Sequence, residues 1–466
     1  MLIALNTLTF ILLVVANGGR HDWAYNVFAL ILWFQLIPVT WELVQKRAKI
    51  HGLGPTFWLL QVILPWVAFS ALYAQSLFNP NFETIYSNLF SPLLPLEYNA
   101  GLPTTPHPAR SLMFLQFAIG LLFMTLSVLL TKTSRRQIRI SLNCLFIFGT
   151  FLAATGALMK LTGSRLFLWV IEFRESTAFA TFFYKNHWAY FALLIAGIGI
   201  ALFQYTHEKE KETGHIPEKS IAYALCTLLI LITIPLAEAR GATLAAIPLA
   251  VVFLYVTTRL LFPGLPRVAT AFTFLLVAAI TCWSVKEMVA PQIARSFERS
   301  ETQLIGYKEY DFRSVKRLAL YRDSLKMFQE KPLWGWGIGS FIHIHPIYAG
   351  EEFYAKGASY PVAYEFAHSD YMQTLAEKGA IGTALLICPF AILFIALFCK
   401  SRWRNPVSLS LLLSGGLVTC TAAIDFTFSN PAIAMGTLLM LTLGIRYALL
   451  SNRTEKRSKA NSTTLS

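Results

Sequence analysis

His368 is the side chain in this sequence best suited to proton transfer. It stands in the segment AHSDYMQTLAEKG, where Ser369 or Asp370 can cap a short helix that ends at Gly379. The histidine therefore lies at the mouth of a helix. Because an imidazole accepts a proton near neutral pH without a special environment, general-base catalysis is one interpretation, and a purely structural histidine is the other.

Arginines at two places are suited to a strongly anionic ligand. Residues 311–330 have apolar side chains at helical spacing, and Arg313 and Arg317 lie one turn apart on the same face. Arg240 occupies a turn between two apolar segments, where a charge needs a counter-ion, a cavity or a ligand. Glu238 is its candidate ion-pair partner. Asp425 occupies a similar turn later in the chain, so functional and structural interpretations stay open for both turns.

The passage WGWGIGSF, between the arginine helix and His368, predicts a turn. Gly335, Gly337 and Gly339 alternate there with bulky apolar residues. The passage neither follows a strand nor ends in Gly-Lys-Ser, so it does not match a nucleotide-binding phosphate loop.

Membrane helices must position these residues. The 466 residues are 55% hydrophobic and 14% charged, which is too little charge for the surface of a soluble protein. Continuous apolar stretches long enough to cross roughly 30 Å of hydrocarbon favour helices over barrel strands. We predict an all-α polytopic membrane protein of about 12 transmembrane helices, near residues 1–17, 23–43, 56–78, 111–131, 140–160, 187–206, 220–237, 241–262, 268–290, 380–399, 406–424 and 431–450.

The basic residues predict the orientation of these spans. Every second connection is rich in Lys and Arg, which is the positive-inside pattern and places both termini in the cytoplasm. These connections account for most of the net charge of +14, so no nucleic-acid partner is indicated. The candidate site residues all fall on the opposite side. A transporter would instead place ionisable groups near the middle of the bilayer.

The same pattern divides the chain into five parts. A large helical loop, predicted to be periplasmic, joins spans 9 and 10, and the Ser-, Thr- and Lys-rich tail is predicted to be disordered. The parts are the first five spans with a periplasmic stretch (1–180), spans 6–9 (181–290), the large loop with the active-site helices (291–379), spans 10–12 (380–450) and the cytoplasmic tail (451–466).

Three motifs resemble those of a known family. RLALYRDSLKMFQEKPLWGWGIGSF followed by AHSDYMQTLAEKGAIG resembles the signature of the O-antigen ligase-related family of bacterial membrane enzymes. TFFYKNHWAYF and EARGATL resemble two further elements of that family. The resemblance covers roughly residues 181–430, and the first third of the chain is similar only as generic spans.

The resemblance implies a C-type glycosyltransferase fold in the inner membrane of a bacterium. It also implies an undecaprenyl-diphosphate-linked glycan as donor, the surrounding membrane lipids as partners, and no metal or other cofactor. His368 matches the family's essential histidine, Arg317 its loop arginine and Arg240 its turn arginine. Asp425 matches a late acidic position less closely.

Other positions are expected to support the site. Where this chain has Ser369 the family more often has asparagine, and where it has Tyr321 the family more often has tryptophan. The further supporting residues are Asn186, His187 and Glu377, whereas the roles of Lys185 and Arg174 stay open.

The chemistry expected from these residues is a single displacement with inversion. Arg240, Arg317 and Arg313 would bind the donor diphosphate, and His368 would take the proton of the acceptor hydroxyl. An O-antigen ligase acting on lipid A-core is the first choice. A repeat-unit polymerase acting on another lipid-linked glycan follows, then pilin glycosylation, for which the chain lacks an added C-terminal region. A polysaccharide transporter or flippase is the alternative outside the enzymes.

Overall fold

The chain folds almost entirely into helices, as a computed structural model describes it over residues 2–45, 105, 108–164, 166–167, 171–172, 178–214, 217–262, 314–350, 353–354, 361–398 and 405–463. The helices of the first half are α1 (Leu2–Val15), η1 (Asn17–Gly19), α2 (Asp22–Trp33), α3 (Leu36–Val44), α6 (Pro108–Leu130), α7 (Arg135–Thr162), α8 (Lys185–Thr213) and α9 (Glu218–Leu236). They are followed by α10 (Arg240–Leu261), α12 (Ser314–Glu330), α13 (Phe341–Tyr348), α14 (Asp370–Phe398), α15 (Pro406–Thr421), η6 (Thr427–Ser429) and α16 (Pro431–Thr463). Strands β1 (Leu166–Phe167) and β2 (Ile171–Glu172) form one short antiparallel pair.

The helices confirm a polytopic membrane protein. Seven helical segments in the described part of the chain are long and apolar enough to cross a membrane, counting α2 and α3 together, and α1 and α15 are shorter apolar helices. The predicted spans at 56–78 and 268–290 lie outside the described residues, so the count of twelve stays a prediction. The C-type glycosyltransferase fold is likewise not established by these helices.

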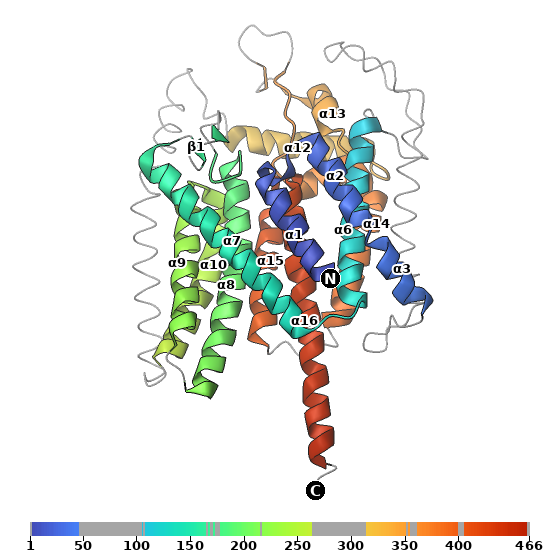
Figure 1. Cartoon of the computed structure of the whole chain (residues 1–466). Helices are drawn as coiled ribbons and strands as arrows, with labels where there is room; N and C mark the ends of the chain where they lie inside the picture. Colours follow the sequence, from blue (N-terminus) through green and yellow to red (C-terminus); the bar gives the residue numbers. More distant parts are fainter. Residues whose placement is uncertain are drawn as a thin grey trace.

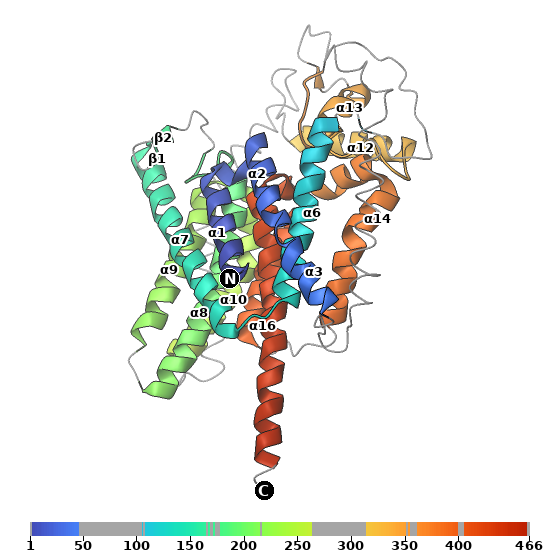
Figure 2. The ribbon, with the colours of Figure 1, turned by 45° about the vertical axis from the view of Figure 1, so that its right-hand side comes forward.

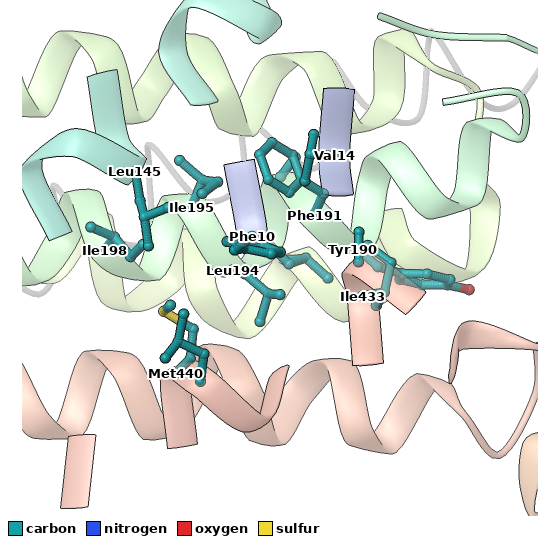
Figure 3. Packing of buried hydrophobic residues seen from close by; sticks show 14 of the residues in the cluster. Phe10, Val14, Leu145, Tyr190, Phe191, Leu194, Ile195, Ile198, Ile433 and Met440 are labelled. Carbon is teal, nitrogen blue, oxygen red and sulfur yellow. The ribbon is translucent and has the colours of Figure 1, made fainter. Parts of the chain in front are cut away.

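Helix α8 forms the centre of the bundle. All of its residues from Asn186 to Gln204 are buried, and it packs against α7, α9, α10, α15 and α16. Figure 3 shows side chains of α8 meeting those of α1, α7 and α16. Small residues allow this close approach, because a Cβ on Gly197 would collide with Ser414 of α15 and one on Gly199 would collide with Thr227 of α9.

The two ends of the bundle differ. Helix α12 lies across one end, called here the outer end, and α13 lies beside it, while the long C-terminal helix α16 projects from the other end (Figures 1 and 2). Helices α8 and α10 begin at the outer end, and their basic C-terminal turns, with Lys211 and Arg259, lie at the opposite end. This arrangement agrees with the alternation of basic connections.

The last helix extends into the tail. Helix α16 continues without interruption from Pro431 to Thr463, and the disorder predicted for residues 451–466 stays a prediction. Since extending an existing helix avoids the cost of nucleation, a polar tail can follow a membrane span as helix even when its own sequence would not start one.

Gly379 divides α14 into a short outer helix and a long apolar one. Its φ of 62° and ψ of −173° break the helix after residue 378. A Cβ on Gly379 would collide with the backbone of Leu333, and a Cβ on Gly335 (φ 67°) would collide with the backbone of Glu377. The predicted turn at residues 334–341, with Leu333 just before it, therefore packs backbone to backbone against the break, and this contact fixes the direction of the helix that follows His368.

Candidate active site

His368 lies at the outer end, two residues before α14 begins. Its φ is 56°, a left-handed conformation that is strained for a residue with a side chain. The hydroxyl of Tyr321 on α12 donates a hydrogen bond to the His368 carbonyl oxygen at 2.8 Å. The imidazole is 23% exposed. The strained backbone and its clamp therefore present the ring at the surface of the bundle.

Asp425 is the acidic partner of His368. Its Oδ1 lies 3.5 Å from Nδ1 of the imidazole, and the carboxylate is almost fully buried. Asn186 and Tyr190, one turn apart on α8, donate hydrogen bonds to Oδ2 at 2.6 and 2.7 Å. The backbone N–H of Phe426 donates to Oδ1 at 3.0 Å. The carboxylate is thus held in one orientation, with Nδ1 of the imidazole toward it and Nε2 left as the nitrogen that can accept a proton.

The charge state of Asp425 follows from these contacts. Burial by itself would raise the pKa of its carboxyl group. The contact with His368 and the hydrogen bonds from the two α8 side chains, together with the charge of Arg317, outweigh burial and lower that pKa to about 2. Asp425 is therefore an anion at any physiological pH, and it can stabilise a proton received by His368.

Asp370 has the opposite charge state beside it. Its Oδ2 accepts a hydrogen bond from the backbone N–H of Phe428 at 2.7 Å, and its own N–H donates to the Asp425 carbonyl oxygen at 3.2 Å. Burial, assisted by the negative charge of Asp425, raises the pKa of Asp370 to about 8. A neutral Asp370 therefore anchors the connection between α15 and α16 to the start of α14. Ser369, not Asp370, caps this helix, since its Oγ accepts from the N–H of Met372 at 3.3 Å.

Helix α12 brings a positive charge to the pair. Arg317 and Tyr321 are one turn apart on this helix, and the guanidinium of Arg317 is close enough to lower the pKa of Asp425 and to oppose the burial that raises the pKa of Tyr321. The hydroxyl that clamps His368 and the arginine expected to bind the diphosphate thus come from one rigid element. Arg313, the other predicted arginine of this segment, lies outside the described residues.

Arg240 is the first residue of α10 and is exposed at the outer end. A Cβ on the next residue, Gly241, would lie 3.5 Å from the side chain of Ile424, the residue before Asp425. The start of α10 therefore lies close to the connection that carries Asp425. The partner proposed for Arg240, Glu238, forms ion pairs with Lys160 and Lys185 instead, at 2.9 and 3.6 Å. The start of α10 therefore presents Arg240 on a helix N-terminus, an end that itself favours anions.

His187 and Glu377, two of the predicted supporting residues, hold the backbone of the site. The buried His187 lies with Nε2 3.3 Å from the Phe426 carbonyl oxygen, which fixes the connection that carries Asp425. The carboxylate of Glu377 accepts hydrogen bonds from the N–H groups of Gly339 and Phe341 at 3.1 and 3.2 Å. Glu377 therefore secures the glycine turn, whereas Arg174, whose role was left open, lies outside the described residues.

Sequence reasoning missed an aromatic stack and a tyrosine. The Phe426 ring stacks on Tyr184 at 5.0 Å and on Phe366 at 4.8 Å between ring centres, and it meets the His368 ring nearly at right angles at 4.7 Å. Tyr190 could have been found from its spacing of four residues after Asn186, which places both on one face of α8. The stack had no such signal, because its rings come from three separate segments.

The arrangement unites an oriented histidine with cations at one end of a helical bundle. Such a group can deprotonate a hydroxyl and stabilise a departing anion. Residues 225–387 match the family model described as O-Antigen ligase, a range that includes Arg240, Arg317 and His368. A search of curated proteins finds no match to the chain.

Proposed function

We propose that the chain, whose residues 225–387 match the O-antigen ligase family model, is a membrane glycosyltransferase that moves a glycan from an undecaprenyl-diphosphate carrier to an acceptor hydroxyl. Its preferred acceptor is lipid A-core, which makes it an O-antigen ligase. The enzyme has a C-type glycosyltransferase fold in the bacterial inner membrane, with both termini cytoplasmic and the site periplasmic. The positive-inside pattern supports this orientation.

The reaction is one displacement at the anomeric carbon. Nε2 of His368 takes the proton of the acceptor hydroxyl as the oxygen attacks that carbon. The bond from the anomeric carbon to the diphosphate oxygen breaks, and the lipid diphosphate leaves with the bonding pair. Because attack and departure occur on opposite faces, the configuration inverts. Arg240 and Arg317 neutralise the diphosphate, since the planar guanidinium suits phosphate oxygens.

The contact between His368 and Asp425 is the observation that carries this proposal. A histidine held in a strained backbone conformation, facing a buried carboxylate and within the field of Arg317, is arranged for proton transfer beside an anion. A structural histidine would not need the orienting carboxylate. Asp425 is a positioning residue in this scheme, since it acts through the imidazole.

A reconstituted transfer reaction tests the proposal. Proteoliposomes without divalent metal receive an undecaprenyl-diphosphate-linked repeat unit, with or without lipid A-core, and the products are resolved on a gel. A product that requires lipid A-core is expected. A ladder of longer lipid-linked chains without lipid A-core would instead identify a polymerase, and no product in either reaction would favour a transporter.

His368→Ala gives the residue-level control in the same assay. We expect the rate to fall by roughly 10²- to 10⁴-fold, the usual contribution of a general base. Full turnover by this variant would remove His368 from the mechanism while leaving the identity of the product unaffected.

A further inference from the structure

Two lysines and a glutamate meet beside the active site without a place in the mechanism above. Glu238, in the turn between α9 and α10, pairs with Lys160 at the end of α7 and with Lys185 at the start of α8. The side chains of Lys160 and Glu238 are 41% and 39% exposed, and that of Lys185 is 25% exposed. One carboxylate is thus shared by two ammonium groups at the outer end.

The cluster is poorly explained by stability alone. Partly exposed ion pairs contribute little to folding. Glu238 also has a left-handed backbone with φ of 61°, which costs free energy in a residue with a side chain. Such strain is typical of functional sites, and His368 has the same conformation. The hydrogen bond from Lys160, with the charges of both lysines, lowers the pKa of Glu238, so the carboxylate is ionised at neutral pH.

A continuous series of contacts joins this cluster to the reacting histidine. Lys185 is followed by Asn186, whose amide donates to Asp425 at 2.6 Å, and Asp425 lies 3.5 Å from His368. Arg240 stands two residues after Glu238, at the start of α10. A group bound by the two lysines would therefore lie next to the arginine that is expected to hold the donor diphosphate.

We propose that Lys160 and Lys185 form a second phosphate-binding subsite, in which the carboxylate of Glu238 occupies the place of a phosphate group until a lipid-linked substrate arrives. This inference rests on the proposed function for the source of the phosphate. Lysine binds phosphate as a flexible point charge, and a phosphate with more than one negative charge attracts two ammonium groups more strongly than a single carboxylate does. Glu238 is then a built-in competitor that keeps weak anions out of the subsite.

Calorimetric titration of the full chain in neutral detergent with inorganic pyrophosphate tests this subsite. Each variant is also made in an Arg317→Gln background, so that binding at that arginine does not mask the result. We expect the Lys160→Gln/Lys185→Gln variant to bind pyrophosphate several-fold more weakly. Glu238→Gln should bind it roughly two- to fivefold more tightly, which is the gain expected when a partly exposed ion pair is removed.

Matched controls come from the other end of α8. Lys209→Gln and Glu212→Gln remove the same charges from exposed positions there and should bind pyrophosphate as the parent does. Repeating the titration in nanodiscs of zwitterionic lipid, with or without phosphatidylglycerol, distinguishes the sources. Competition by phosphatidylglycerol that disappears in the double lysine variant would assign the subsite to bilayer phospholipid. No competition would assign it to the diphosphate head of a substrate.

Unchanged pyrophosphate affinity in the double lysine variant would overturn the subsite, and so would weaker binding by Glu238→Gln. These titrations require no turnover. Failure of the subsite is therefore distinguishable from failure of the transferase reaction, which the His368→Ala assay reports separately.

Discussion

Replacing Asp425 by asparagine separates its charge from its shape. Asparagine has nearly the same volume, and its amide oxygen can accept the hydrogen bonds of Asn186 and Tyr190 in place of Oδ2, so helix α8 should stay in place. Its amide nitrogen then replaces Oδ1 and loses the hydrogen bond from the Phe426 N–H. The main element lost is the negative charge 3.5 Å from Nδ1 of His368. That charge stabilises the imidazolium that forms when His368 takes the proton of the acceptor.

The size of the effect follows from this distance. Two unit charges 3.5 Å apart attract by roughly 5 kcal/mol at an effective dielectric constant of about 20. Since each 1.4 kcal/mol corresponds to a tenfold change in rate, about three powers of ten is the upper limit. The proton is only partly transferred in the transition state, so we expect Asp425→Asn to lower kcat by about 10- to 10³-fold.

Single-turnover transfer in proteoliposomes, measured from pH 6 to 9, provides the assay. The rate of Asp425→Asn should be low across this range while its KM for the donor changes little, because Asp425 faces the histidine and not the diphosphate. The low pKa of Asp425, about 2, means that its own titration does not enter this range. A rate within twofold of the parent, with a normal melting temperature, would refute the proposed pairing.

Three further variants test the surrounding structure. Tyr321→Phe removes the hydrogen bond to the His368 carbonyl oxygen, and this loss of about 1 kcal/mol should lower kcat several-fold. Tyr371→Phe removes a similar hydrogen bond, to the Thr419 carbonyl oxygen at 2.7 Å, and should leave kcat unchanged. Equal kcat values for the two variants would show that Tyr321 does not hold His368 for the reaction. Asp370→Asn should flatten the pH dependence of the melting temperature between pH 5 and 8. The pKa of Asp370 is raised to about 8, with Asp425 and Lys378 as the charged groups around it. The stability that its neutral form contributes is therefore fully present below the ordinary pKa near 4 and is lost as the pH rises through 8. A parent protein whose melting temperature does not fall between pH 5 and 8 would contradict this. Gly335→Ala should lower the free energy of unfolding by clearly more than the roughly 1–2 kcal/mol that a left-handed alanine costs, because its Cβ meets the backbone of Glu377. Gly163→Ala, at φ 66° with open space around it, should cost only that amount, as measured by thermal unfolding. Equal losses of stability in the two variants would mean that the outer helices tolerate separation.

The sequence by itself predicted the elements and the residue types of the site. Apolar run length predicted the spans, because the thickness of hydrocarbon fixes the length of a crossing helix. Helical spacing predicted the helix that carries Arg317, which is α12, and the glycines predicted the turn before His368. These are local properties, for which a few neighbouring residues suffice.

Only the tertiary structure decided which of these residues meet. Asn186 and Asp425 are 239 residues apart in the chain and share a hydrogen bond, and Tyr321 reaches the carbonyl of His368 across 47 residues. Glu238, the sequence's candidate partner for an arginine two residues away, pairs with lysines from two other helices. Local spacing cannot foresee such contacts, because they depend on how α7, α8, α10 and α12 pack, and packing is settled by the buried surfaces of whole helices rather than by the polar residues at their ends.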